Sequence, residues 1–316
     1  MSTVNHTMYR CRVIIAVTLL LPVAGFCQDP KGLYPGPPGM NAFMFYYRHI
    51  EGDEKYVDGN EKANAVSFDM DLAMLRVIHF FPIGSTGWTF GPNLIVPFGS
   101  KHQEQTSPLP SGGYFNQTST GFGDPQAVFI LYSPTPKGAN GVQLMFAQYI
   151  TVPMGDYHND QAVNMGSNRW AFKEELGIGW KPIKKLTLEP IVNCEFYTKN
   201  DDYGIGPYGT SGELKQDPLF NALMHISWDF TDNLFMTITP NYTWGGKTKV
   251  NGIDGGNVET WSGWFTAGIK LNPNNQILLQ LVHDFDVKNG IAQNQVRIRY
   301  AFFCHHRRET RPKSSE

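Results

Sequence analysis

Two side chains capable of proton transfer and nucleophilic attack stand two positions apart in the sequence, at His225 and Ser227. A serine beside a histidine can act as a nucleophile, provided that a third group orients the histidine. Large apolar residues, Ile226 and Trp228, alternate with this pair. Because successive side chains of a strand point to opposite faces, His225 and Ser227 share the polar face of a strand. We expect a polar strand surface here and assign no catalytic residue, so the protein is not expected to be an enzyme.

Other residues with chemical potential form no recognisable site. Cys194 and Cys304 stand far apart in the sequence and match no disulfide framework or zinc spacing. His305 and His306 follow Cys304 in a polar tail, and the acidic residues of the predicted loops do not have the spacing of a calcium loop. We therefore predict no metal site and no cofactor.

The N-terminus has the pattern of an export signal. Arg10 and Arg12 precede an unbroken apolar run over residues 13–26. This run is too short to cross a bilayer as a helix but has the length of a signal-peptide core. The sequence therefore predicts a cleaved signal over residues 1–27 and an exported protein.

The composition of the chain favours an all-β protein. Charged residues make up 17%, aromatic residues 13%, and hydrophobic residues 41% of the sequence, yet the mean hydropathy is −0.30. Alternating apolar and polar residues produce such an average, whereas a helical membrane protein does not. The net charge is −2 and no basic stripe is present, which excludes nucleic acid as an expected partner.

Period-two alternation divides the remaining chain into strands. We predict twelve, over residues 41–49, 64–80, 87–97, 124–133, 142–152, 168–180, 185–198, 218–230, 233–244, 260–271, 276–285 and 293–302. Long and short connections alternate between them, as in outer-membrane barrels, whose closure satisfies every backbone hydrogen bond in lipid. A soluble β-sandwich or a lipocalin-like barrel also alternates. The export signal, the order of the gaps and the tryptophans near strand ends favour an all-β transmembrane antiparallel β-barrel of about 12 strands.

Charged residues on the polar face of these strands are expected to line the lumen. The final strand illustrates the pattern, since Arg297 and Arg299 alternate with Val296, Ile298 and Tyr300. The mixed sign of the whole set predicts no strong ion selectivity. Closure would bring Arg297 and Arg299 near Asp69 and Asp71 of the second predicted strand. We therefore expect either an ion-pair network at the seam or simple hydration of these charges in a wet lumen. The lumen candidates are Asp69, Asp71, Lys173, Glu175, Glu189, Glu195, His225, Asp229, Lys270, Arg297 and Arg299.

Several motifs together resemble a known family. They are "TGFGDPQAVFILYSP" (120–134), "VPMGDY" (152–157) followed by "NMGSNRWAF" (164–172), and "YTWGGKTKVNG" (242–252). Their order and spacing are similar to those of the outer-membrane family named for the meta-pathway of phenol degradation, over essentially the whole predicted mature chain. The resemblance implies a barrel of about a dozen strands that transports small, often aromatic, hydrophobic compounds. It does not identify phenol as the substrate.

These observations define the expected organisation of the chain. We predict a signal peptide at 1–27, a Pro/Gly-rich periplasmic lead-in at 28–40, an outer-membrane barrel at 41–303 and a flexible polar tail at 304–316. A twelve-stranded barrel lies between those filled by side chains and the open porins, so a narrow or plugged channel is expected.

The expected function is passive passage of small, hydrophobic or aromatic compounds across the outer membrane of a Gram-negative bacterium. Expected partners are outer-membrane lipid, the barrel-assembly machinery through the C-terminal strand, and small hydrophobic solutes. A polypeptide export pore is an alternative, although the lead-in is too short and too Pro-rich for a periplasmic trimerising segment. A purely structural barrel is a second alternative.

Overall fold

The computed structural model describes residues 28–62, 66–105, 115–136, 140–204 and 212–305. Throughout these residues the regular structure is β-strand. No helix in the described part of the chain is long and apolar enough to cross a membrane. The predicted signal at 1–27 and residues 306–316 of the predicted tail lie outside the described residues.

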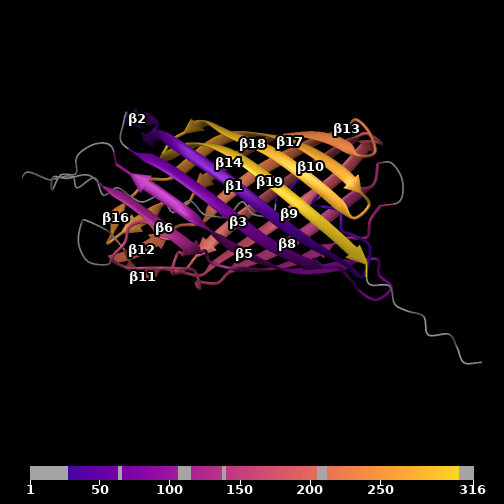
Figure 1. Ribbon diagram of the computed structural model, residues 1–316, viewed down its shortest axis with the longest axis horizontal. Helices are drawn as coiled ribbons and strands as arrows, with labels where there is room; N and C mark the ends of the chain where they lie inside the picture. The colour runs from indigo at the N-terminus through magenta and orange to yellow at the C-terminus, as the bar shows by residue number, and fades with distance from the viewer. Residues whose placement is uncertain (1–27, 63–65, 106–114, 137–139, 205–211, 306–316) are drawn as a thin grey trace, which may run out of the picture.

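Twelve antiparallel strands close into one barrel, as the alternation predicts (Figure 1). Closure comes from pairing of the first strand with the last, in a register that joins Phe43 to Phe302 and Tyr47 to Ile298. Every neighbouring pair is antiparallel and consecutive around the wall. The barrel strands are β1 (Met40–Val57), β3 (Ser67–His79), β5 (Thr89–Glu104), β7 (Gln126–Tyr132), β8 (Val142–Thr151), β9 (Ala171–Ile183), β10 (Leu186–Tyr197), β13 (Leu219–Asp229), β14 (Leu234–Gly245), β17 (Val258–Asn272), β18 (Asn275–Val287) and β19 (Gly290–His305).

The two ends of the barrel differ in their connections. Short turns join β9 to β10 and β17 to β18 at one end, which by the rule for outer-membrane barrels is periplasmic. Longer connections at the opposite end carry extra strands, and this end is extracellular. There, β2 (Asn60–Lys62) and β6 (Asn116–Phe122) pair with β1 and β5, while β4 (Phe81–Pro82) lies in a short turn at the other end. A separate sheet also forms there, from β11 (Asn200–Tyr203), β12 (Gly212–Gln216), β15 (Thr248–Val250) and β16 (Ile253–Asp254).

Two boundaries differ from the sequence prediction at the last strands. β18 and β19 are longer than expected, so that only residues 288–289 connect them. Cys304 and His305, assigned to the tail, continue β19 and pair with Asn41 and Met40 of β1. Ladder hydrogen bonds to β1 hold these two residues in the strand.

The outer wall is apolar because one side of each strand alternation faces lipid. Outward side chains such as Phe45, Leu176 and Ile238 are 52%, 57% and 63% exposed. Six of the seven tryptophans are also exposed, which suits interfacial belts. Trp264 is the exception, since it is only 6% exposed and points into the lumen. The prediction that the tryptophans mark the lipid interfaces therefore fails at Trp264.

Candidate functional site

The first described residues of the chain lie inside the barrel, where they contact inward-facing side chains of five strands. We call residues 28–34, "QDPKGLY", the lumen segment. The sequence prediction placed these residues in a periplasmic lead-in. Their hydrogen bonds to β9, β10, β13 and β19 instead place them within the periplasmic half of the lumen.

Asp29 of the lumen segment binds one side of the barrel. Its Oδ2 accepts hydrogen bonds from Arg299 Nη1 of β19 and from Tyr46 Oη of β1, both at 2.8 Å. Burial acts to raise the pKa of Asp29, but the charge of Arg299 and these two hydrogen bonds outweigh it and hold the pKa below its usual value of 3.8. Asp29 is therefore ionised when the segment is bound at neutral pH.

Lys31 and Gln28 bind the opposite side. The Lys31 ammonium pairs with Asp229 of β13, and its backbone N–H donates to Glu189 Oε2 of β10 at 2.7 Å. Gln28 Nε2 donates to Glu175 Oε2 of β9 at 2.9 Å. The segment thus spans the lumen. Its Asp29 pairs with a base on one side of the barrel, and its Lys31 pairs with an acid on the other side.

Two glycines of β9 make room for the segment. A Cβ atom built on Gly177 would lie 2.6 Å from Leu33 Cδ2, and one on Gly179 would lie 2.9 Å from Tyr34 Oη. Leu33 is only 2% exposed, and Lys181 Nζ lies 4.2 Å from the centroid of the Tyr34 ring. Glycine at 177 and 179 therefore lets the segment approach the strand backbone closely.

Most charged side chains of the lumen are grouped by sign on different walls, although Lys173 lies beside Glu175 on the inner face of β9. Arg48 and Arg76 join the predicted Arg297 and Arg299 on the inner face of β1, β3 and β19, which we call the basic wall. Glutamates and an aspartate of β9, β10 and β13 form the acidic wall; they are Glu175, Glu189, Glu195 and Asp229. The sequence showed the mixture of signs but not this separation, because each strand is far in sequence from the strand it faces.

Between these two walls lies a third, apolar wall. Among the inward residues of β3, β5, β7 and β8 are methionines and aliphatic side chains that are 6% exposed or less, interspersed with polar ones; the apolar members include Met70, Leu72, Met74, Ile95, Val128, Ile130 and Met145. Methionine side chains adapt their shape to varied apolar contacts. This side of the barrel interior is therefore a packed apolar surface beside the charged walls.

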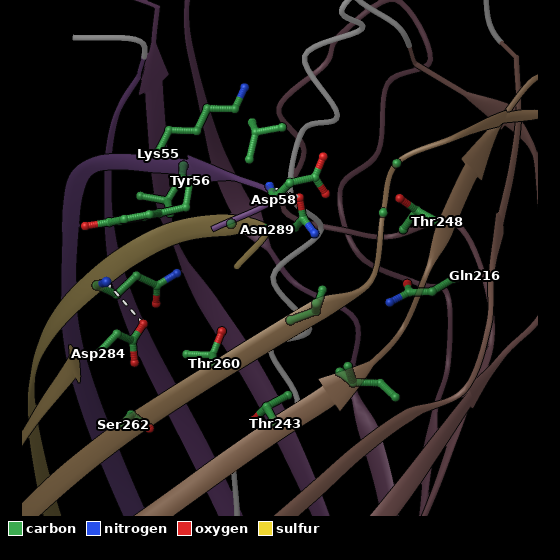
Figure 2. A pocket seen from close by; sticks show the side chains of 18 of the residues that line it. Lys55, Tyr56, Asp58, Gln216, Thr243, Thr248, Thr260, Ser262, Asp284 and Asn289 are labelled. Carbon is green, nitrogen blue, oxygen red and sulfur yellow. Dashed lines mark hydrogen bonds between the residues drawn. The ribbon is translucent and has the colours of Figure 1, made fainter. Parts of the chain in front are cut away.

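The extracellular half of the lumen is hollow where the periplasmic half is filled. A cavity of about 460 Å³, which we call the outer cavity, is lined by β1, β14, β17, β18 and β19. Figure 2 shows Thr243, Thr260, Ser262 and Asp284 around it. Trp264 and Arg297 line it too, and Arg297 precedes by two residues the Arg299 that binds the lumen segment. The outer cavity therefore ends close above the lumen segment.

The connection between β8 and β9 folds over the mouth on the other side. Ser167 N–H donates to Asp124 Oδ2 at 2.7 Å, and Lys101 Nζ of β5 donates to the Asn164 carbonyl at 3.0 Å. Val163 in this connection is fully buried. These bonds join the connection to β5 and to Asp124, which shortly precedes β7. The motif at 152–157 and most of the motif at 164–172 lie in this connection. Nothing in their amino-acid sequence predicts that the connection folds inward.

Most of the predicted lumen residues have the expected orientation. Glu175, Glu189 and His225 are 2%, 0% and 0% exposed, and Lys173 Nζ lies 3.9 Å from the centroid of the Tyr149 ring. Glu195 and Arg299 are also buried on the inside, whereas Asp229 and Arg297 are partly buried there. Lys270 shares the inward parity of Trp264 but is exposed at the periplasmic rim.

Asp69 and Asp71 were predicted for the lumen, but they lie on the outer surface of β3. The inward positions next to these aspartates are taken by Phe68, Met70 and Leu72, so this part of the strand is apolar on its lumen face. Asp71 accepts a hydrogen bond from Tyr47 Oη at 2.6 Å and contacts His49 Nδ1 at 2.9 Å, both on the outside. The predicted seam pairing with Arg297 and Arg299 is therefore wrong.

The His225 and Ser227 pair forms no nucleophile–base contact. His225 Nδ1 lies 2.7 Å from Thr239 Oγ1, and Ser227 Oγ lies 2.8 Å from Thr237 Oγ1. Both bonds join β13 to β14 across the ladder. The pair contributes to inward polar packing between two strands, as the sequence prediction expected of a strand surface.

The sequence prediction missed four residues that build the lumen site, namely Asp29, Lys31, Arg48 and Arg76. Arg48 and Arg76 fall within predicted strands, and the parity of their apolar neighbours could have placed them. Asp29 and Lys31 precede the first strand, so strand periodicity gives no indication of their position.

Comparison with solved structures supports the barrel fold. An outer-membrane channel from Pseudomonas putida F1 superposes with a TM-score of 0.78 at 23% identity, over 87% of this chain and 99% of that chain. The transport unit of the autotransporter AIDA-I from Escherichia coli has a TM-score of 0.48 at 9% identity, covering 89% of this chain and 93% of that one. The CymD monoaromatic hydrocarbon channel has a TM-score of 0.43 at 9% identity, with 88% and 92% covered.

The family comparison is more specific than the structural one. No curated protein matches the chain. A family model described as "Putative MetA-pathway of phenol degradation" matches residues 52–300, which is more than half of the chain. The match includes the motifs at 120–134, 152–172 and 242–252. The protein is an outer-membrane β-barrel, and it belongs to this family.

Proposed function

We propose that this barrel is a passive channel for small hydrophobic or aromatic compounds, with the lumen segment as its periplasmic gate. The observation that carries the proposal is the position of residues 28–34, which are bound across the lumen below an open outer cavity. A purely structural barrel would need neither a hollow half nor a separate chain segment bound across the lumen below it.

The apolar wall supports the proposed class of solute. Met70, Leu72 and Met74 of β3 lie on the same inner surface of the barrel as Ile95, Val128 and Met145 of the following strands. Apolar side chains on a lumen wall can take an apolar solute out of water as it moves. The CymD channel is described as a monoaromatic hydrocarbon channel, which agrees with this class but does not carry the proposal.

The export alternative has less support. The lumen segment fills the periplasmic half of the lumen and is hydrogen-bonded to β9, β10 and β19. A polypeptide would have to displace these bonds and also pass the connection at 152–170. We also propose, from the last strand's pairing and aromatic end, that the barrel-assembly machinery recognises β19.

Uptake of an aromatic solute into vesicles with a lipopolysaccharide outer leaflet would test the proposal. We expect the refolded protein to accelerate the uptake of benzyl alcohol over protein-free vesicles. Leu72→Asp, which puts a carboxylate on the apolar wall, should slow it. Thr237→Asp adds the same charge on the polar side of the lumen and serves as the matched control. Equal rates with and without protein would contradict the proposed function.

A further inference from the structure

Arg297 and Arg299 lie on the same face of β19 but have different partners. Arg299 pairs with Asp29 at 2.8 Å. Arg297 forms no ion pair with any residue that the structure describes. Its guanidinium is nevertheless only partly exposed, and it borders the outer cavity. A partly buried guanidinium without a counter-ion costs free energy that a bound anion can offset.

Neutral groups hold the Arg297 side chain in one orientation. Its Nε and Nη2 donate to Gln295 Oε1 at 2.9 and 2.6 Å, and its Nη1 donates to Gln280 Oε1 at 2.9 Å. The Cζ atom lies 4.8 Å from the centroid of the Trp264 ring. A guanidinium has five N–H donors, so one N–H on each terminal nitrogen is left without a partner among the described residues. The Arg297 guanidinium is therefore held in one orientation and has two N–H groups available to a ligand.

The surroundings of Arg297 suit an anion attached to an apolar body. Arg48 is its direct cross-strand neighbour on β1 and adds positive charge. Trp264, Val282 and Ile291 supply apolar surface in the same cavity. Asp284 also lines the cavity, but it accepts the Gln293 backbone N–H at 3.1 Å and forms no ion pair with Arg297.

We propose that the inner end of the outer cavity is a binding subsite for small ring-containing carboxylic acids. The solute carboxylate accepts the two remaining N–H groups of Arg297, a geometry that guanidinium groups favour. The ring contacts Trp264, Val282 and Ile291. This inference rests on the proposed function and narrows its solute class from aromatic compounds in general to those with one carboxylate.

Calorimetric titration of the refolded protein in detergent tests the subsite without any transport. The probes are benzoate and benzyl alcohol, which share a ring and differ in charge. We expect benzoate to bind at least about tenfold more tightly, the scale of a charge-assisted hydrogen bond. Arg297→Gln should remove this preference. Lys55→Gln, which removes a cation from the mouth of the same cavity, is the matched control and should retain it.

Gln295→Leu provides a second variant in case Arg297→Gln does not fold. It leaves the charge in place but removes two of the hydrogen bonds that orient the guanidinium, and we expect a partial loss of the benzoate preference. Equal binding of benzoate and benzyl alcohol to the unaltered protein would overturn the subsite, as would an undiminished preference in Arg297→Gln. Benzoate binding without accelerated solute uptake would instead refute the channel function and leave the subsite standing.

Discussion

The two halves of the lumen differ in how the space inside the barrel is occupied. In the periplasmic half, the lumen segment fills the space and pairs its charges with both walls, through Asp29 to Arg299 and through Lys31 to Asp229. In the extracellular half, hydroxyl, amide and charged side chains, together with a few apolar ones, surround an open cavity of about 460 Å³. Resistance to solute passage should therefore lie in the filled half, and selectivity in the hollow half.

The largest expected effect comes from reversing the charge of Arg299. Arg299→Glu opposes a carboxylate to Asp29 in a partly buried site, and breaking such a pair costs about 3–5 kcal/mol. We expect the lumen segment to detach and the ion conductance of the barrel in planar bilayers to rise. Asp29→Lys in the same molecule should restore the low conductance. High conductance in the double variant would show that pairing with Asp29 is not what holds the segment.

A smaller effect is expected from filling the space that Gly177 leaves for Leu33. Gly177→Val inserts atoms into a contact where even a Cβ would lie 2.6 Å from Leu33 Cδ2, and overpacking of this kind costs about 1–3 kcal/mol. We expect more frequent channel openings in single-channel records. Gly263→Val, on the outward-facing side of β17, is the control and should open no more often than the unaltered protein. Matching opening rates for all three proteins would argue against close packing as a cause of closure.

Acidification should also weaken the filled half. The pKa of Asp29 is lower when the segment is bound than its usual value of 3.8, so the bound state is favoured above that value and loses this stabilisation as the pH falls through the lowered pKa. We expect conductance to increase below about pH 3.8. Asp29→Asn should conduct with little dependence on pH in this range. A response of the same size in Asp29→Asn would assign the effect to other groups.

The smallest effect is expected in the hollow half. Thr243→Trp places a large ring in the outer cavity, but the filled half limits flow in the intact protein. Conductance should change little in the unaltered background and fall clearly once the lumen segment has been removed. A strong decrease in both backgrounds would place the main constriction in the extracellular half.

The barrel could be predicted from the sequence because strand period and connection length are local properties. Val296, Ile298 and Tyr300 alternate with Arg297 and Arg299, and this alone gives the two faces of β19. The same rule misplaced Asp69 and Asp71, because β3 carries apolar residues on both faces and its polar outer residues lie near the extracellular end.

The lumen segment could not be predicted in this way. Asp29 and Lys31 bind residues that are 270 and 198 positions away in the chain. Nothing periodic precedes the first strand, and a Pro/Gly-rich stretch is equally suited to a linker. Only closure of the barrel brings the basic and acidic walls to opposite sides of a segment that carries one charge of each sign.

Single-channel conductance after deletion of residues 28–34 tests the central claim most directly. The deletion removes the filling of the periplasmic half and leaves every barrel strand intact. We predict a stably folded barrel with larger and longer openings than the unaltered protein. An unchanged conductance, with the barrel shown to be folded by its heat stability, would contradict the assignment of the lumen segment as the gate.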